Sequence, residues 1–194
     1  MSGYKPIPIG IEDFKEIIDR EYYFVDKTML IRDILDSGSK VTLFTRPRRF
    51  GKTLNMSMLK RFFEKTEEDN SYLFDGFAIS GAGDKYKSYI EQYPVISISL
   101  KSMKQSTWGE SFSQFKEIIA NEFERHQEIL KCDSISGRKR KRIQGVLEDT
   151  ADDTVYLTTL KLLSDCLYEV YNKKVIVLID EYDVPLDKAF QHGY

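Results

Sequence analysis

Residues 45–57 read TRPRRFGKTLNMS, and this stretch decides the fold that the sequence predicts. The residues just before it, 40–45 (KVTLFT), form a compact β-prone run between turn residues and Pro47. From Lys52 onward the apolar residues recur at the spacing of one helical face, at Leu54, Met58, Leu59, Phe62 and Phe63. The pattern therefore predicts a strand at 40–45, a short loop through Gly51, and a helix beginning at Lys52.

A loop that ends in Gly-Lys-Thr between a strand and a helix suits a polyphosphate ligand. Backbone N–H groups and the helix N-terminus direct partial positive charge at the anion. Gly51 would let the backbone approach closely, Lys52 would reach the β- and γ-phosphates, and the Thr53 hydroxyl would bind Mg²⁺. Phe50 and Leu54 flank these residues and complete the expected nucleotide-binding loop.

The loop departs from the usual Walker A pattern, G-x-x-x-x-G-K-[ST], at the first glycine, where this chain has Arg46. Arg46 lacks the freedom of glycine at positive φ, and Pro47 lacks an N–H donor. Guanidinium groups bind phosphate through paired donors, so Arg48 and Arg49 are candidates for nucleotide contacts. The alternative is that these arginines are solvated or pair with nearby carboxylates.

A second motif, VIVLIDEYD at residues 175–183, supplies an acidic partner for the loop. Its continuous apolar run is typical of a strand covered on both faces in a parallel sheet. Asp180 at the end of this strand is placed to hold Mg²⁺, directly or through water, as a Walker B residue does. Glu181 would be the base that polarises the attacking water. Asp183 fits either support of the metal ligand or a turn cap.

Two further patterns extend the order of elements. Residues 94–100, PVISISL, predict another strand, and TWGE at 107–110 has the spacing of a capping box before a helix that runs to about Lys131. An amphipathic helix over 160–170 precedes the acidic strand. The alternation of strands and helices predicts an α/β fold with a parallel sheet.

The beginning of the chain reads as a helical lead-in over residues 1–38 with two short helices. Asp26 is the candidate cap of the second of them. Because no linker composition interrupts the sequence, we expect one domain over residues 1–194.

The composition is that of a globular protein, with 41% hydrophobic and 31% charged residues and a formal net charge of -2 over 194 residues. No run approaches the roughly 18 apolar residues that span a bilayer, and residues 1–14 lack a secretory layout, so we expect a cytoplasmic protein without membrane contact. GRKRKR at 137–142 could bind nucleic acid. It reads more simply as a solvated helix start, because no aromatic residues interleave with it.

Taken together, these motifs resemble the predicted AAA-ATPase-like proteins, P-loop domains often followed by a nuclease-like domain of the PD-(D/E)XK type. The resemblance covers nearly the whole chain through IPIGIEDFKEII, YYFVDKT, TRPRRFGKTLNMSML, PVISISLK and LIDEYDVPLDKAF. The family's own loop is similar to RPRRFGKT, so the absent first glycine is a shared feature. The resemblance implies a three-layer P-loop NTPase sandwich of the ASCE, AAA-like type. It also implies Lys52 and Thr53 at the phosphates of ATP, with Asp180 and Glu181 at Mg²⁺ and water.

The activity that the resemblance implies is Mg²⁺-dependent ATP hydrolysis. The chain ends at Tyr194, before the strands that would carry a sensor residue and an arginine finger. We therefore expect a domain truncated after the Walker B strand, whose activity can be lost even with the site residues intact. The alternative is a nucleotide-gated interaction module that binds ATP without turnover and signals through a protein partner or homo-oligomer.

Overall fold

The structure is a computed structural model that describes residues 4–45 and 50–194. Its contacts group into two compact units, Met1–Tyr93 (unit 1) and Pro94–Tyr194 (unit 2). Unit 1 contains α1 (Phe14–Asp19), α2 (Met29–Ser37), α3 (Lys52–Phe63), η1 (Ser71–Phe74), η2 (Ala78–Gly81) and α4 (Asp84–Lys87). Unit 2 contains β1 (Val95–Ser99), α5 (Trp108–Arg125), η3 (Gln127–Lys131), α6 (Gly137–Leu147), α7 (Asp153–Tyr156), α8 (Thr159–Tyr171), β2 (Ile176–Asp180) and α9 (Asp183–His192). The expected single domain over 1–194 stays a prediction, and each unit is described by itself.

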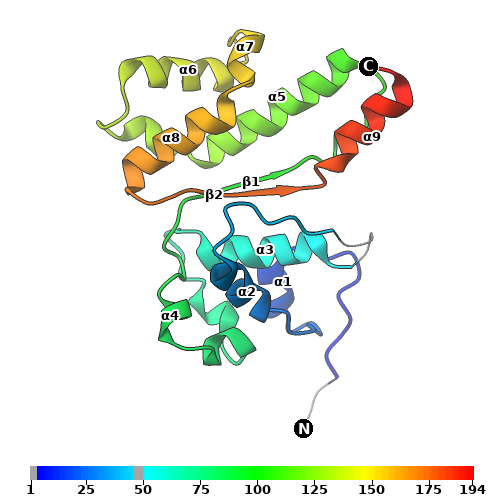
Figure 1. The fold of residues 1–194 in the computed structure, drawn as a ribbon, viewed down its shortest axis with the longest axis vertical. Coiled ribbons are helices and arrows are strands. Elements are labelled where there is room, and N and C mark those ends of the chain that lie inside the picture. The colour runs from blue at the N-terminus through cyan, green and yellow to red at the C-terminus, as the bar shows by residue number, and fades with distance from the viewer. Residues whose placement is uncertain (1–3, 46–49) are drawn as a thin grey trace. The chain divides into compact units, whose positions relative to one another are not determined.

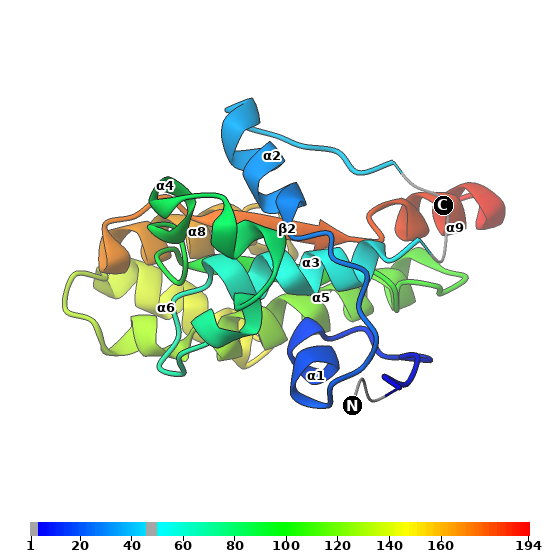
Figure 2. The same ribbon diagram turned by 90° about the horizontal axis from the view of Figure 1, so that it is seen from below.

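Aromatic side chains form the centre of unit 1. The ring of Phe74 lies 5.0 Å from that of Phe62 on α3 and 5.3 Å from that of Phe14 on α1, between ring centroids. The backbone N–H of Phe14 donates to the Ser57 hydroxyl of α3 at 2.9 Å, and Arg61 pairs with Asp13 at 2.8 Å. Seen in Figure 2, α1 and α2 lie on either side of α3. These contacts hold α3, the helix that begins at the lysine loop, against α1 and η1.

Unit 2 is built on two parallel strands. The pairing runs in register from Val95 opposite Ile176 to Ser99 opposite Asp180. In Figure 1, α5 and α8 lie along one face of this pair. The core between them contains Ile96 and Ile98 of β1 with buried residues of the helices, among them Ile119, Phe123, Leu163, Cys166 and Leu167. The mixed α/β architecture with a parallel sheet is therefore confirmed, with both later strands where the sequence predicts them.

The edge of β1 that faces away from β2 is closed by side chains of α5 and its C-cap. The N–H of Ser97 donates to the Glu122 carboxylate at 2.8 Å. The carbonyl of Val95 accepts from Arg125 and lies 3.1 Å from Nε2 of His126. Because the cluster satisfies strand groups that would otherwise be left unpaired, it ends the sheet at this edge without another strand.

The charges of Glu122, Arg125 and His126 stabilise one another. Burial raises the pKa of Glu122, but hydrogen bonds from His126 and Arg125 outweigh it, so the pKa lies below its usual value. Burial lowers the pKa of His126, but its hydrogen bonds to Glu122 and Glu128 outweigh that effect and raise the pKa above its usual value. Glu122 is therefore held ionised while only 5% exposed.

We expect Glu122→Gln to destabilise unit 2 by about 3 kcal/mol, because it leaves the buried His126 and the half-buried Arg125 without their counter-charge. Urea unfolding followed through the fluorescence of Trp108, the single tryptophan, would measure the loss. Glu124→Gln, at a nearby exposed position of α5, is the matched control and should change stability little. Equal unfolding midpoints for the two variants would contradict a stabilising role for Glu122.

The predicted strand at residues 40–45 is wrong. The segment carries no strand assignment, and the side chains of Val41 and Leu43 are 86% and 61% exposed. A strand is defined by a hydrogen-bonded neighbour, and β-prone side chains express their preference only on a pleated surface that buries them. In the described part of the chain the sheet therefore has two strands, not three.

Two predicted helix starts have different outcomes. At α5 the predicted helix start is confirmed, since the Thr107 hydroxyl accepts from the N–H of Glu110 at 3.3 Å and donates to the Glu110 carboxylate at 2.9 Å. This helix is shorter than expected and ends at Arg125, with η3 reaching Lys131. At α2 the expectation is wrong, because the N-cap is Thr28 and Asp26 lies two residues before it. The Asp26 side chain instead accepts from the N–H groups of Thr28 and Ala78.

Candidate nucleotide site

The lysine loop begins α3 in a conformation that favours glycine. Gly51 is the N-cap of the helix, with φ 73° and ψ 26° in the left-handed region. Its carbonyl accepts the N–H of Asn55 at 2.9 Å, so the helix is hydrogen-bonded from its first turn. Residues with a Cβ atom populate this region at a cost of about 1–2 kcal/mol, which explains why glycine stands here.

Lys52 and Thr53 occupy the first two helical positions, where the backbone N–H groups have no partner within the helix. Both side chains are half-buried, and Leu54 follows them into the helix. Phe50 is exposed on the other side of Gly51. Arg48 and Arg49, the expected phosphate contacts, lie outside the described residues, as do Arg46 and Pro47. The described part of the loop thus presents a cation, a hydroxyl and a helix N-terminus together, the elements that bind a phosphate group.

Asp180 ends β2 in unit 2. Its side chain is buried, 8% exposed, and one carboxylate oxygen accepts the N–H of Glu181 at 3.0 Å. Its carbonyl accepts from Leu100, which continues the pairing with β1. Ser99 stands opposite Asp180 at the carboxyl end of β1. Ligands of parallel sheets bind outside the carboxyl ends of the strands, so Asp180 is at the end where such a ligand is expected.

The backbone turns sharply at Glu181. This residue has φ 53°, a left-handed conformation uncommon for a residue with a side chain, and it is half-buried. Strain of this kind is often found at functional sites, although Glu21, Glu91, Asp149 and Asn172 share it in this chain. The turn separates β2 from α9, a helix that the sequence reasoning did not predict.

Asp183 is the first residue of α9, and Pro185 follows in the first turn. A carboxylate and a proline are both favourable there, because the first turn has positive partial charge and N–H groups that need no helical acceptor. Asp183 therefore has a structural role at the start of α9. A proline two residues after an acidic residue is the signal that could have predicted the helix.

The donors of the expected metal site are oxygen atoms, the Thr53 hydroxyl and the Asp180 carboxylate. Mg²⁺ prefers oxygen ligands and is usually held by one or two protein groups together with phosphates and water. The chemistry of these two residues therefore fits Mg²⁺. Because Thr53 lies in unit 1 and Asp180 in unit 2, their convergence on one ion stays a prediction.

One basic residue near the loop was missed by the sequence reasoning. A Cβ atom placed on Gly51 would lie 3.8 Å from the ammonium nitrogen of Lys27. Lys27 comes from the YYFVDKT segment, 24 positions before Gly51 (51 minus 27). The available signal was the position of Lys27 between Asp26 and Thr28. Aspartate and threonine commonly hold turns by side-chain hydrogen bonds.

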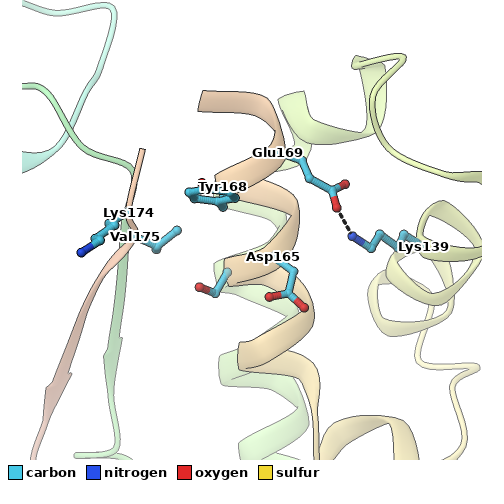
Figure 3. A pocket seen from close by; sticks show the side chains of 7 residues that line it. Lys139, Asp165, Tyr168, Glu169, Lys174 and Val175 are labelled. Atoms are coloured by element: carbon cyan, nitrogen blue, oxygen red, sulfur yellow. Dashed lines mark hydrogen bonds and ion pairs between the residues drawn. The ribbon is translucent and has the colours of Figure 1, made fainter. Parts of the chain in front are cut away.

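The basic run of α6 is engaged within unit 2. Lys139 pairs with Glu169 of α8, as Figure 3 shows, and Arg142 donates to the hydroxyl of Thr158 at 2.9 Å. Arg140 donates to the carbonyls of Cys132 and Ile135 at 2.7 and 3.0 Å. Lys139, Arg140 and Arg142 of the run therefore tie the start of α6 to its neighbours.

An open hollow of about 450 Å³ lies beside α8, near the amino end of β2. Figure 3 shows it between Tyr168 and Asp165 of α8 and the chain at Lys174 and Val175. Its walls carry both signs of charge and include none of the expected site residues. It lies at the opposite end of β2 from Asp180, away from the carboxyl end where a ligand of a parallel sheet is expected.

Comparison with known proteins decides the family. The family model described as "AAA-ATPase_like: Predicted AAA-ATPase" matches residues 8–194. The chain belongs to this AAA-ATPase-like family. A P-loop fold and nucleotide binding are what membership implies, and the lysine loop at the start of α3 lies within the matched residues.

Among relatives of this AAA-ATPase-like chain is a protein of Azotobacter chroococcum mcd 1 described as "Uncharacterized protein in vnfD 5'region". The two are 35% identical over 96 residues, 49% of this chain and 17% of the relative. The match therefore spans about one sixth of that protein's length. No solved structure matches the chain. In the part of the chain that the structure describes, no helix is both long and apolar enough to cross a membrane.

Proposed function

We propose that this chain is an ATP-binding P-loop domain that hydrolyses ATP with Mg²⁺. The observation that carries the proposal is the left-handed Gly51 at the start of α3, with Lys52 and Thr53 in the first turn of a twelve-residue helix. Within a chain of the AAA-ATPase-like family, this arrangement is the phosphate-binding half of a nucleotide site.

The loop residues have separate tasks in the proposal. The N–H groups at the start of α3 bind phosphate oxygens, and Lys52 compensates the charge of the β- and γ-phosphates. Arg48 and Arg49 add paired donors to the same phosphates. Thr53 would hold Mg²⁺, which would neutralise negative charge on the phosphate oxygens of the nucleotide.

The acidic pair forms the hydrolytic half. Asp180 holds Mg²⁺ from the end of β2, and Glu181 orients a water molecule and accepts its proton as the water attacks the γ-phosphate. The turn at Glu181 supports this role, because it directs the chain away from the strand at the residue that must face the ligand. In this proposal Lys52 and Asp180 meet at one triphosphate, and the chain has the three-layer ASCE type of P-loop fold.

A second candidate is a nucleotide-gated interaction module that binds ATP without turnover. The observation that favours it is the division of the two halves, since Lys52 and Thr53 belong to unit 1 and Asp180 and Glu181 to unit 2. Binding can therefore persist in one unit when the catalytic geometry is not assembled. Such a module would act through a protein partner or a second copy of the chain.

Measuring ATP binding and phosphate release on the same preparation separates the two functions. We expect saturable ATP binding that requires Mg²⁺ for full affinity, together with phosphate release that rises with enzyme concentration. Removal of Mg²⁺ with a chelator should stop the release. Binding without release would support the interaction module, and the absence of both would contradict the assignment of a nucleotide site.

A further inference from the structure

The turn that carries Lys27 is fixed by hydrogen bonds on both sides of it. One carboxylate oxygen of Asp26 accepts from the N–H and the hydroxyl of Thr28, at 2.8 and 2.7 Å. The other accepts from the N–H of Ala78 at 2.8 Å. The hydroxyl of Thr28 accepts from the N–H of Ile79 at 3.2 Å, and Thr28 is fully buried. Lys27 therefore projects from a backbone whose neighbours on either side are held to η2.

The side chain of Lys27 reaches the lysine loop. Its ammonium nitrogen lies 3.8 Å from the position that a Cβ atom would take on Gly51, the N-cap of α3. Lys27 is exposed, and no ion pair or hydrogen bond joins its side chain to another described residue. Both Lys27 and Gly51 belong to unit 1, so this proximity is a property of one compact unit.

A cation at this place is unfavourable without an anion. The N-terminus of a helix carries partial positive charge and repels an ammonium group. Lys52, at the first position of the same helix, adds a second positive charge nearby. A phosphate group bound at the helix start would outweigh both repulsions, because it would accept hydrogen bonds from the ammonium groups.

From this geometry we infer that Lys27 is a second phosphate-binding lysine of the nucleotide site. Its ammonium donates to a non-bridging phosphate oxygen of the nucleoside triphosphate, while Asp26 and Thr28 hold the turn that positions it. The inference rests on the proposed function and deepens it. It makes the YYFVDKT segment of the helical lead-in a part of the binding site, although this segment precedes the loop by many residues.

The test compares Lys27→Gln with the wild-type chain by titration with ATP at low and high salt. We expect the variant to bind ATP about tenfold more weakly at low salt, the effect of losing one charge-assisted hydrogen bond. The difference should shrink at high salt, because ions screen an exposed cation. Lys27→Arg, which keeps the charge, should retain most of the affinity. A purely structural role would not give this dependence on salt and charge.

Lys5→Gln is the matched control, since Lys5 is another exposed lysine of unit 1 and the change in net charge is the same. Equal ATP affinity for Lys27→Gln and Lys5→Gln would overturn the inference while leaving the nucleotide site in place. Failure of the wild-type chain to bind ATP would overturn the proposed function and the inference together. Urea unfolding midpoints equal to wild type would show that a loss of affinity in Lys27→Gln is not a loss of folding.

Discussion

Lys52→Ala should abolish ATP binding, lowering the affinity at least about 100-fold. The substitution removes the cation at the first position of α3, while alanine is the best helix former and leaves the helix start intact. Isothermal titration of the purified chain with ATP and Mg²⁺ measures the effect directly.

The control for this variant is Lys5→Ala, which removes a positive charge elsewhere in unit 1 and should leave ATP affinity unchanged. Far-UV circular dichroism should show equal helix content in the two variants. If Lys52→Ala bound ATP with the affinity of the wild type, the assignment of the loop as the phosphate site would be refuted.

Glu181→Gln should keep ATP binding and lower the rate of phosphate release by about 10²- to 10⁴-fold, the usual contribution of a general base. Glutamine has nearly the shape of glutamate and the same side-chain length, so the turn at φ 53° between β2 and α9 is retained. It cannot take a proton from the attacking water. Steady-state phosphate release at saturating ATP measures the loss, and the ATP affinity of the same sample shows whether binding persists.

Asp187→Asn is the matched control for Glu181→Gln, because Asp187 is an exposed carboxylate on α9, a few residues further along the chain. It should release phosphate at the wild-type rate. A Glu181→Gln variant that turned over ATP as fast as this control would show that another group activates the water.

Much of the local structure could be predicted from sequence because it depends on neighbours along the chain. The helix that begins at Lys52 and the capping box at Thr107 follow from side-chain periodicity and from polar groups within one turn. The strands β1 and β2 follow from apolar runs that a parallel sheet buries. Asp180 was placed correctly at the end of its strand for the same reason.

Other features depended on contacts between distant residues. Residues 40–45 have strand-like composition, yet their side chains are exposed and no described segment pairs with them. Glu122 reads as an ordinary polar position of α5, but it accepts the N–H of Ser97, 25 residues away, and closes the sheet edge. Aspartate commonly caps helices, but the carboxylate of Asp26 accepts the N–H of Ala78 at the start of η2.

Local pattern was therefore sufficient for the family, the α/β class, the glycine and lysine at a helix start, and the acidic pair after a buried strand. These features depend on the spacing of residues within one helix or strand, because the period of that element determines on which face each side chain lies. Tertiary contacts alone decided that side chains of α5 close the free edge of β1 and that Lys27 lies near Gly51. The physical reason is that such proximities arise from packing and long-range hydrogen bonds, which bring together residues that have no fixed separation in sequence.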